Sequence, residues 1–141
     1  MILWRISNYP DLTGMGGLLH PGRWHSRGRP VVYLAESAAG ALLEALVHIE
    51  AVHPSELPRS YQLVEVEILE READDLATTQ DCLDLPEGWQ NDPVITRRIG
   101  DRWLASAASL LLRVPSAVMG RSFNYLFNPV HPLARTSRIL S

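Results

Sequence analysis

The chain has 141 residues, of which 46% are hydrophobic and 21% charged, and its formal net charge is −3. These values are ordinary for one soluble globular domain with a buried core, and the negative charge argues against a general nucleic-acid binder. All 13 basic residues are arginines and Cys82 is the single cysteine, which excludes a lysine nucleophile or Schiff base, an internal disulfide framework and a thiolate zinc cluster.

The first 30 residues are predicted to form one short strand and a long loop. Residues 1–7 (MILWRIS) read as the strand, and Arg5 inside it either faces water or belongs to a site. Residues 8–30 are rich in glycine and proline, and loops of this length are usually functional or disordered. Residues 22–28 (GRWHSRG) combine arginine, an aromatic ring and glycine. That composition suits a phosphate-bearing ligand, but a basic surface hairpin would share it.

The centre of the sequence is predicted to be a buried strand followed by a helix. The strand covers residues 31–34, and Ser37 caps a helix that spans Ala38 to Ile49. The helix is apolar nearly all round, so most of it should be buried. Glu44 interrupts this pattern, and a buried carboxylate is costly unless it is paired or hydrogen-bonded. Glu44 therefore either shares a narrow solvent stripe with His48 or points into a cleft.

The second half of the chain is predicted to add three strands and one helix. Residues 61–69 alternate as a strand should, with Leu63 or Val64, then Val66 and Ile68, facing inward. Residues 70–93 read as an acidic, irregular surface excursion. The remaining predicted elements are a helix capped by Asp92 and running to about Ala108, and strands at 110–114 and 137–140.

Several common functional patterns are absent from the sequence. The five histidines lack the spacing of a metal site, so we expect no bound metal. Neither a P-loop nor a G-x-G-x-x-G pattern occurs. Because no apolar run approaches about 18 residues and no signal peptide precedes the first strand, we expect a cytoplasmic protein without a membrane segment.

Several segments, taken in order, resemble the RES-domain family, whose members are mostly toxins of bacterial toxin–antitoxin pairs. The matching segments span nearly the whole chain and are WRIS, GRW, GRPVVYLAES, ALLEALVH, IGDRWL, LRVPSAV and NYLFNPVHP. Two positions depart from the family pattern. His25 stands where members usually have asparagine, which could alter loop contacts near a ligand. Residues 119–122 (MGRS) replace a frequent Pro-Glu, which we expect to weaken the anchoring of Ser116.

The resemblance implies a single α+β domain over residues 1–141, with a curved split sheet and flanking helices like those of ADP-ribosyltransferases. Such a domain would grip NAD in a cleft, as a substrate rather than a cofactor. The residues matching the family's catalytic positions are Glu44, Arg23 and Tyr33. The residues expected to bind NAD are Arg5, Ser116 and Asn124.

These residue types suit the chemistry. Cleaving the nicotinamide–ribose bond develops oxocarbenium character at the ribose, which the Glu44 carboxylate can stabilise. Arginines such as Arg5 and Arg23 bind a pyrophosphate through charge-assisted hydrogen bonds. The ring of Tyr33 can stack on the nicotinamide, with its hydroxyl free for one polar contact.

The resemblance implies a toxin of a type II toxin–antitoxin system that degrades NAD by transferring ADP-ribose to phosphate or water. One alternative is a mono-ADP-ribosyltransferase that modifies a protein of nucleotide metabolism, and another is a catalytically inactive partner-binding module. We expect an antitoxin with a helix-turn-helix domain to cover Arg23, Tyr33 and Glu44. The sequence leaves the acceptor of ADP-ribose open, and also the choice between a homo-oligomer and a hetero-oligomer with the antitoxin.

Overall fold

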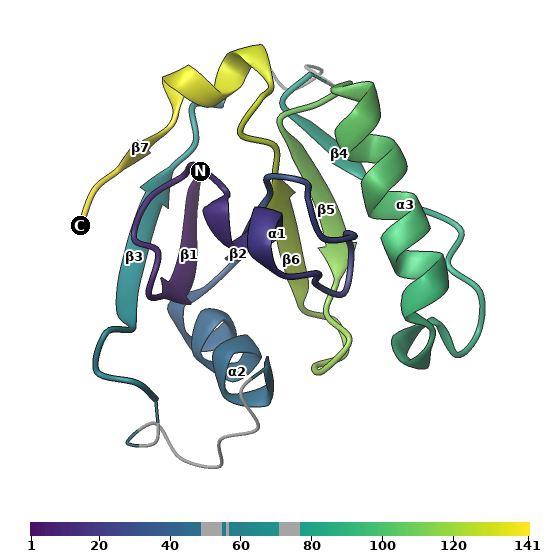
Figure 1. Cartoon of the computed structure of the whole chain (residues 1–141), viewed down its shortest axis with the longest axis horizontal. Helices are drawn as coiled ribbons and strands as arrows, with labels where there is room; N and C mark the ends of the chain where they lie inside the picture. Colours follow the sequence, from purple (N-terminus) through teal and green to yellow (C-terminus); the bar gives the residue numbers. More distant parts are fainter. Residues whose placement is uncertain (49–54, 56, 71–76) are drawn as a thin grey trace.

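The protein folds around one mixed, open, seven-stranded sheet. A computed structural model describes residues 1–48, 55, 57–70 and 77–141. The strand order is β4-β5-β6-β2-β1-β3-β7, and only β4 and β5 pair in parallel (Figure 1). The strands are β1 (Ile2–Ser7), β2 (Val32–Ala35), β3 (Gln62–Glu67), β4 (Thr79–Asp81), β5 (Leu111–Pro115), β6 (Phe123–Phe127) and β7 (Arg138–Ile139).

Helices lie at the sides and one end of this sheet. The α-helices are α1 (Met15–Leu19), α2 (Ala38–His48) and α3 (Pro93–Ser106), and the 3₁₀ turns are η2 (Trp89–Asn91) and η3 (Pro132–Thr136). In Figure 1, α3 runs beside β4 and β5, and α2 lies at the lower end of the sheet. None of the helices formed by the described residues combines the length and apolar character needed to cross a membrane.

The helix starts follow from local capping chemistry. Ser37 Oγ accepts a hydrogen bond from the Gly40 amide at 2.9 Å, and the Asp92 carboxylate accepts one from the Ile95 amide at 3.4 Å. Each side chain satisfies a backbone N–H that has no partner within its helix. Both caps were predicted from the sequence and are confirmed.

Two hydrophobic clusters hold the domain together. The first draws on β1, β2, β3, β5 and β6 and comprises Leu3, Val32, Leu34, Val64, Val66, Ile68, Leu110, Leu111 and Phe127. The second joins α3 and the segment before β2 to β5 and β6 and comprises Trp24, Val31, Trp103, Leu104, Leu112, Val114 and Leu126. Because the strands alternate, the two clusters occupy opposite faces of β5 and β6.

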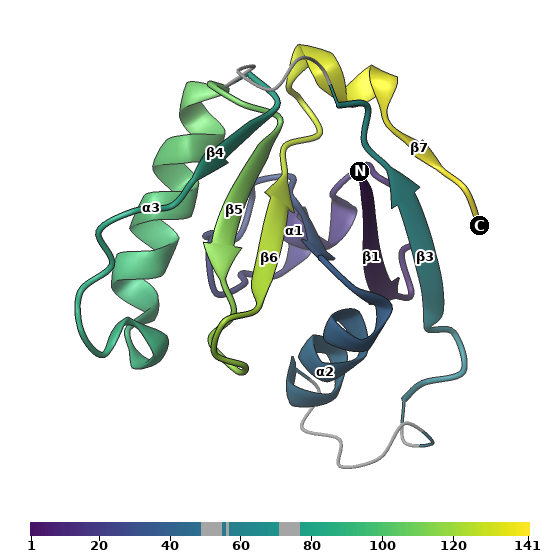
Figure 2. The ribbon, with the colours of Figure 1, turned by 180° about the vertical axis from the view of Figure 1, so that it is seen from behind.

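The sheet divides at its middle, between β1 and β2. These two strands pair only through Trp4 and Ala35, whereas β1 pairs with β3 at six successive residues from Ile2 to Ser7. Figure 2 shows β1 and β3 turning away from β6 and β5 on either side of this joint. The predicted α+β class and the expected split in the sheet are thus confirmed.

Several local predictions were wrong. Residues 8–30 contain α1, whose sequence MGGLL has weak helix propensity, so tertiary packing rather than propensity stabilises it. Residues 70–93 include β4, a three-residue strand held by its parallel pairing with β5, and β6 was not predicted as a strand. In α2, only Ala41 and Ala45 are fully buried, so its burial is less than expected. Ile49, its predicted end, lies outside the described residues.

The loop before β2 packs against α3 with almost no space between their backbones. At Gly100 of α3, a Cβ atom would overlap the carbonyl of Trp24. One helical turn earlier, the Thr96 hydroxyl donates a hydrogen bond to the carbonyl of Arg23. A glycine in α3 is therefore required for the approach of residues 23–24 to this helix.

We predict that Gly100→Ala lowers the free energy of unfolding by about 1–3 kcal/mol, because overpacking outweighs the gain of roughly 1 kcal/mol in helix propensity. Denaturant unfolding would measure this change. Gly120→Ala is the matched control, since nothing lies within 4 Å of a Cβ at Gly120. Equal stability of the Gly100 variant and wild type would contradict the close backbone contact.

Candidate active site

The Glu44 carboxylate is fixed by two side chains from the far part of the chain. Its Oε1 atom accepts hydrogen bonds from Ser116 Oγ at 2.8 Å and from Asn124 Nδ2 at 2.9 Å. Ser116 follows β5 and Asn124 lies in β6, so the two bonds connect α2 to these strands. No hydrogen bond to the other oxygen, Oε2, is found among the described residues. Of the two alternatives for Glu44, the structure therefore supports the one that points into a cavity.

Ser116 is itself held in place by the turn after β5. Its Oγ accepts hydrogen bonds from the amides of Val118 and Met119, each at 3.1 Å, while its own amide donates to Ser122 O at 2.8 Å. The single hydroxyl proton is thereby directed to Glu44. Although residues 119–122 depart from the family pattern, Ser116 is anchored to them by two of these bonds.

A cavity of about 210 Å³ opens in front of this carboxylate. Its lining residues come from α2, the start of β6 and the two turns that flank them, and they are Glu36, Ser37, Ala39, Gly40, Leu43, Glu44, Ser116, Met119, Ser122, Phe123 and Asn124. Sequence reasoning missed Glu36, whose Oε1 accepts a hydrogen bond from the Phe123 amide at 3.1 Å. The position of Glu36 directly after a buried strand is the sequence signal from which it could have been predicted.

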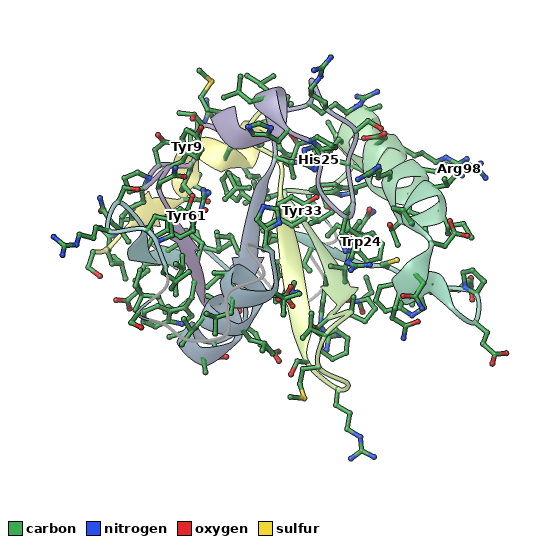
Figure 3. All side chains as sticks on the ribbon, turned by 60° about the horizontal axis from the view of Figure 1, so that its bottom comes forward. Tyr9, Trp24, His25, Tyr33, Tyr61 and Arg98 are labelled. Atoms are coloured by element: carbon green, nitrogen blue, oxygen red, sulfur yellow. The ribbon has the colours of Figure 1, made fainter. Side chains whose placement is uncertain are left out.

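Tyr33 of β2 forms a second cluster with the loop that precedes its strand. Its hydroxyl lies 2.6 Å from His25 Nδ1 and accepts a hydrogen bond from the Trp24 amide at 3.1 Å. The other ring nitrogen of His25, Nε2, lies 3.0 Å from the carbonyl of His20. Figure 3 shows Tyr33 beside both His25 and Trp24. The expectation that the Tyr33 hydroxyl is free for a ligand was wrong.

Protonation states follow from the surroundings. Burial lowers the pKa of His25, so its ring is neutral near pH 7, and burial raises the pKa of the Tyr33 hydroxyl, which stays protonated. Because the carbonyl of His20 can only accept, the single ring proton of His25 lies on Nε2. The Tyr33 hydroxyl therefore donates to Nδ1 of His25.

Strand register relates the Tyr33 cluster to the residues that hold Glu44. Tyr33 pairs with Leu126, and Ala35, two residues further along β2, pairs with Asn124. Residues two apart on a strand share a face, and such diagonal neighbours lie roughly 7–8 Å apart. Tyr33 therefore lies on the same face of the sheet as Asn124, the residue that binds the Glu44 carboxylate.

Arginines surround the outer edge of the Tyr33 cluster. The exposed Arg23 donates from one terminal nitrogen to Gln90 O at 2.6 Å, and Arg97 of α3 donates to Gly22 O at 2.8 Å. Sequence reasoning singled out Arg23 but missed Arg97. Both positive charges lie close enough to influence the Tyr33 hydroxyl, whose pKa their field lowers slightly against the larger effect of burial.

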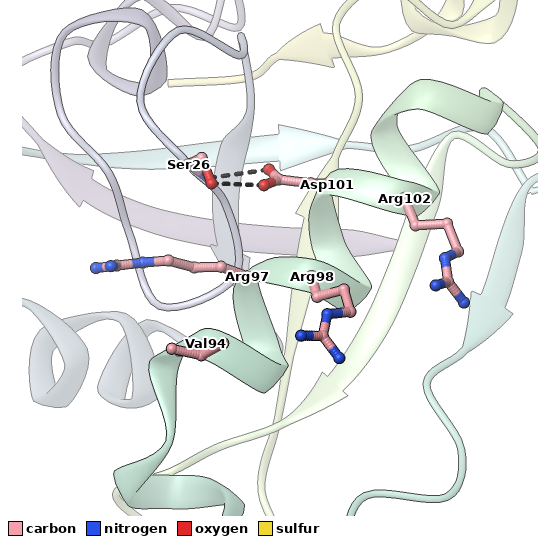
Figure 4. A pocket seen from close by; sticks show the side chains of 6 residues that line it. All are labelled: Ser26, Val94, Arg97, Arg98, Asp101 and Arg102. Atoms are coloured by element: carbon pink, nitrogen blue, oxygen red, sulfur yellow. Dashed lines mark hydrogen bonds between the residues drawn. The ribbon is translucent and has the colours of Figure 1, made fainter.

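A shallower cavity of about 480 Å³ lies on the outer side of α3. It is lined by Ser26, Val94, Arg97, Arg98, Asp101 and Arg102. Asp101 accepts hydrogen bonds from the amide and hydroxyl of Ser26, at 2.9 and 2.6 Å (Figure 4). Arg98 and Arg102 extend away from Ser26 in the same view. No residue that lines this cavity also lines the cavity at Glu44.

Arg5 is not brought together with the other predicted site residues. It shares the sheet face of Leu3, whereas Trp4 pairs with Ala35 on the face that carries Tyr33. Its guanidinium donates to Asp11 O at 2.9 Å and to Ser7 Oγ at 2.8 Å, and burial lowers its pKa. These bonds brace the start of the loop after β1, and a role of Arg5 in NAD binding stays a prediction.

No group of three or more metal-ligating side chains that could hold an ion occurs within the described ranges. The fold and the site therefore define a small α+β protein that presents a hydrogen-bonded carboxylate, an aromatic ring and an arginine-rich edge on one sheet. Such a set can bind an anionic ligand and stabilise positive charge beside the carboxylate.

The chain belongs to the RES-domain family of toxins, whose domain model matches residues 2–140. It is 48% identical to "Toxin Res" of Pseudomonas putida, over 99% of this chain and 92% of that protein. It is 39% identical to "Toxin Res" of Photorhabdus laumondii, over 92% of this chain and 83% of the relative. "Prs ADP-ribosylating toxin" of a Sphingobium species is 34% identical, over 94% and 84% respectively.

We predict that the buried, neutral His25 makes the protein less stable as the pH falls below its ordinary pKa of 6.5. The folded state has the lower pKa, so the unfolded state binds the proton first and gains stability, by up to about 1.4 kcal/mol per pH unit. Denaturant unfolding between about pH 7.5 and 5.5 would show a flatter profile for His25→Asn. His131, whose pKa burial also lowers, supplies the comparison variant His131→Asn. Identical slopes in wild type and His25→Asn would rule out this contribution.

Proposed function

We propose that this toxin degrades NAD by cleaving the nicotinamide–ribose bond and passing ADP-ribose to water or phosphate. The observation that carries the proposal is the arrangement at Glu44, where both hydrogen bonds fall on Oε1. Glu44 lines the cavity, and the proposal assigns to its second oxygen, Oε2, the task of accepting hydrogen bonds from the ribose or stabilising its positive charge. In this function NAD is the substrate, and no separate cofactor takes part.

The geometry fits the charge that develops during this reaction. As the nicotinamide leaves, the ribose gains oxocarbenium character, which a fixed carboxylate stabilises without first having to reorient. Ser116 and Asn124 supply that fixation and so act on the substrate through Glu44. Glu36, across the same cavity, offers a second acceptor for ribose hydroxyls.

Tyr33 and Arg23 supply the binding surface in this proposal. The half-buried ring of Tyr33 presents a flat face for the nicotinamide, since its hydroxyl is already engaged. Arg23 uses one terminal nitrogen for Gln90, and its remaining N–H groups are available to the pyrophosphate. We assign the pyrophosphate to Arg23 rather than Arg5, because Arg5 lies on the other face of the sheet.

A second candidate function is mono-ADP-ribosylation of a protein. It is favoured by the similarity to the Sphingobium protein named "Prs ADP-ribosylating toxin". Both functions use the same bond cleavage and differ only in the acceptor of ADP-ribose. The third possibility, a catalytically inactive binding module, would give the two hydrogen bonds to Glu44 a structural role alone, and loss of activity in Glu44→Gln without loss of stability would exclude it. For both enzymatic functions we place the protein in the cytoplasm, where NAD is present.

Purified protein incubated with NAD should release nicotinamide, with ADP-ribose as the second product and its phosphorylated form when phosphate is added. Glu44→Gln should keep its melting temperature, because the amide oxygen can still accept both hydrogen bonds, and should lose at least about 99% of the activity, since the charge is gone. Chromatography of the products would measure both. Glu67→Gln, at a surface pair with Arg138, is the control and should act like wild type.

Two outcomes would change the assignment. NAD consumption by Glu44→Gln at the wild-type rate would remove the carboxylate from the mechanism. Nicotinamide release that occurs only with added cell protein, with labelled ADP-ribose attached to that protein, would select mono-ADP-ribosylation instead.

We further propose that a separate antitoxin with a helix-turn-helix domain restrains this toxin by covering Arg23, Tyr33 and Glu44. A carboxylate-bearing end of the partner would compete with the pyrophosphate for the arginines. Adding the partner should therefore raise the apparent KM for NAD in proportion to its concentration. A partner that binds but leaves turnover unchanged, even when saturating, would contradict this steric mode of control.

A further inference from the structure

We infer that the Tyr33 hydroxyl and the His25 ring form a latch that holds residues 22–25 as a turn and so keeps Arg23 at the edge of the site. His25 is then a positioning residue, which acts on a ligand only through Tyr33 and Arg23. The ligand that Arg23 binds is taken from the proposed function, and the existence of the latch does not depend on it.

The hydroxyl of Tyr33 already makes hydrogen bonds within the protein. The hydroxyl proton goes to His25 Nδ1, and the hydroxyl oxygen accepts from the Trp24 amide. His25, which is 2% exposed, is fixed in turn by its bond from Nε2 to the carbonyl of His20. To act as a general acid, the phenol would have to break its bond to His25, because its single proton is already donated there. Its hydroxyl is a structural connection.

The turn closes around that hydroxyl. The Gly22 amide donates to His25 O at 3.1 Å, which brings the two ends of residues 22–25 together. At Gly22, a Cβ atom would overlap the Tyr33 hydroxyl and crowd His25 Nδ1. Only glycine allows the backbone to approach the phenol this closely. Gly22, His25 and Tyr33 therefore depend on one another.

Arg23 lies within this turn and is held from the other side by α3. Its carbonyl accepts from the Thr96 hydroxyl, and the neighbouring Gly22 carbonyl accepts from Arg97. The backbone on both sides of Arg23 is thus fixed between β2 and α3. Loss of the Tyr33 contact would leave the backbone of Arg23 held from the α3 side alone, and the bond from its guanidinium to Gln90 O would then start from a less firmly fixed turn.

The two nitrogens of His25 can be tested separately by substitution. In asparagine, the amide group stands at the same distance from the backbone as Nδ1 and can accept from Tyr33. In glutamine, the amide group reaches the position of Nε2 and can donate to the His20 carbonyl, but it leaves the Tyr33 hydroxyl without its acceptor. The latch therefore predicts that His25→Asn is tolerated and His25→Gln is not.

The first measurement is hydrogen exchange of the Trp24 amide, which requires no ligand. We expect exchange about tenfold faster in Tyr33→Phe, which removes the acceptor of the Trp24 amide, and in His25→Gln, which removes the acceptor of the Tyr33 hydroxyl. His25→Asn should exchange at a near wild-type rate. His131→Asn replaces another buried histidine and is the control. Unchanged exchange in Tyr33→Phe, or faster exchange in His25→Asn than in His25→Gln, would overturn the latch.

The second measurement is calorimetric binding of ADP-ribose, which does not depend on turnover. Tyr33→Phe and Arg23→Ala should each weaken binding by about tenfold, and the double variant should bind no more weakly than Arg23→Ala alone. Multiplied losses would show that Tyr33 does not act through Arg23. If wild type binds ADP-ribose but does not consume NAD, the proposed function fails while both measurements still decide the latch.

Discussion

The two hydrogen bonds that meet at Glu44 Oε1 are the interaction on which the rest of this structure depends. A carboxylate in the middle of an apolar helix would be expelled toward water without them. Because the donors come from the strand and the turn at the far end of the chain, satisfying Glu44 also fixes α2 against the sheet. The same two bonds make the helix compatible with the fold and hold Glu44 at the wall of the cavity. The two hydrogen bonds to Glu44 therefore contribute to the packing of α2 and to the orientation of the carboxylate.

The arginine side of the site is organised by a different contact, the approach of the loop backbone to Gly100 of α3. This approach lets Thr96 donate a hydrogen bond to the carbonyl of Arg23, and Arg97 to the carbonyl of Gly22. The loop is therefore an extension of the rigid helix–sheet packing. Long glycine-rich loops usually combine function with mobility. In this one, the glycines serve close packing, at Gly17 against the Arg29 carbonyl and at Gly22 against Tyr33.

Elements with strong local signals could be predicted from the sequence, and elements stabilised by distant partners could not. β3 was predicted because Val64, Val66 and Ile68 alternate with polar residues, and α3 because Asp92 and Pro93 mark its start. The strand β4 has the sequence TQD, which carries no such pattern, and exists because β5 offers it a parallel partner. The five residues of α1 include two glycines and are held by the surrounding packing.

The candidate site divides in the same way. Glu44 was conspicuous because its charge conflicts with its apolar helix, and Arg23 because it lies among glycines and an aromatic residue. No local pattern identifies Ser116 or Asn124 as partners of Glu44, since only folding brings them together, and only the family resemblance singled them out. The internal hydrogen bonds of the Tyr33 hydroxyl could not be predicted from the sequence either. They depend on the ring tautomer of His25, which the residue types alone do not determine.

The separation of the Glu44 partners along the chain also bears on how the protein comes into being. Ser116 and Asn124 lie 72 and 80 residues after Glu44. During synthesis, which adds roughly 5–20 residues per second, α2 can form several seconds before its carboxylate acquires either donor. A nascent or truncated chain that stops short of β6 therefore carries the Glu44 carboxylate without the two donors that fix it. The arrangement around Glu44 can therefore form only once nearly the whole chain has been translated.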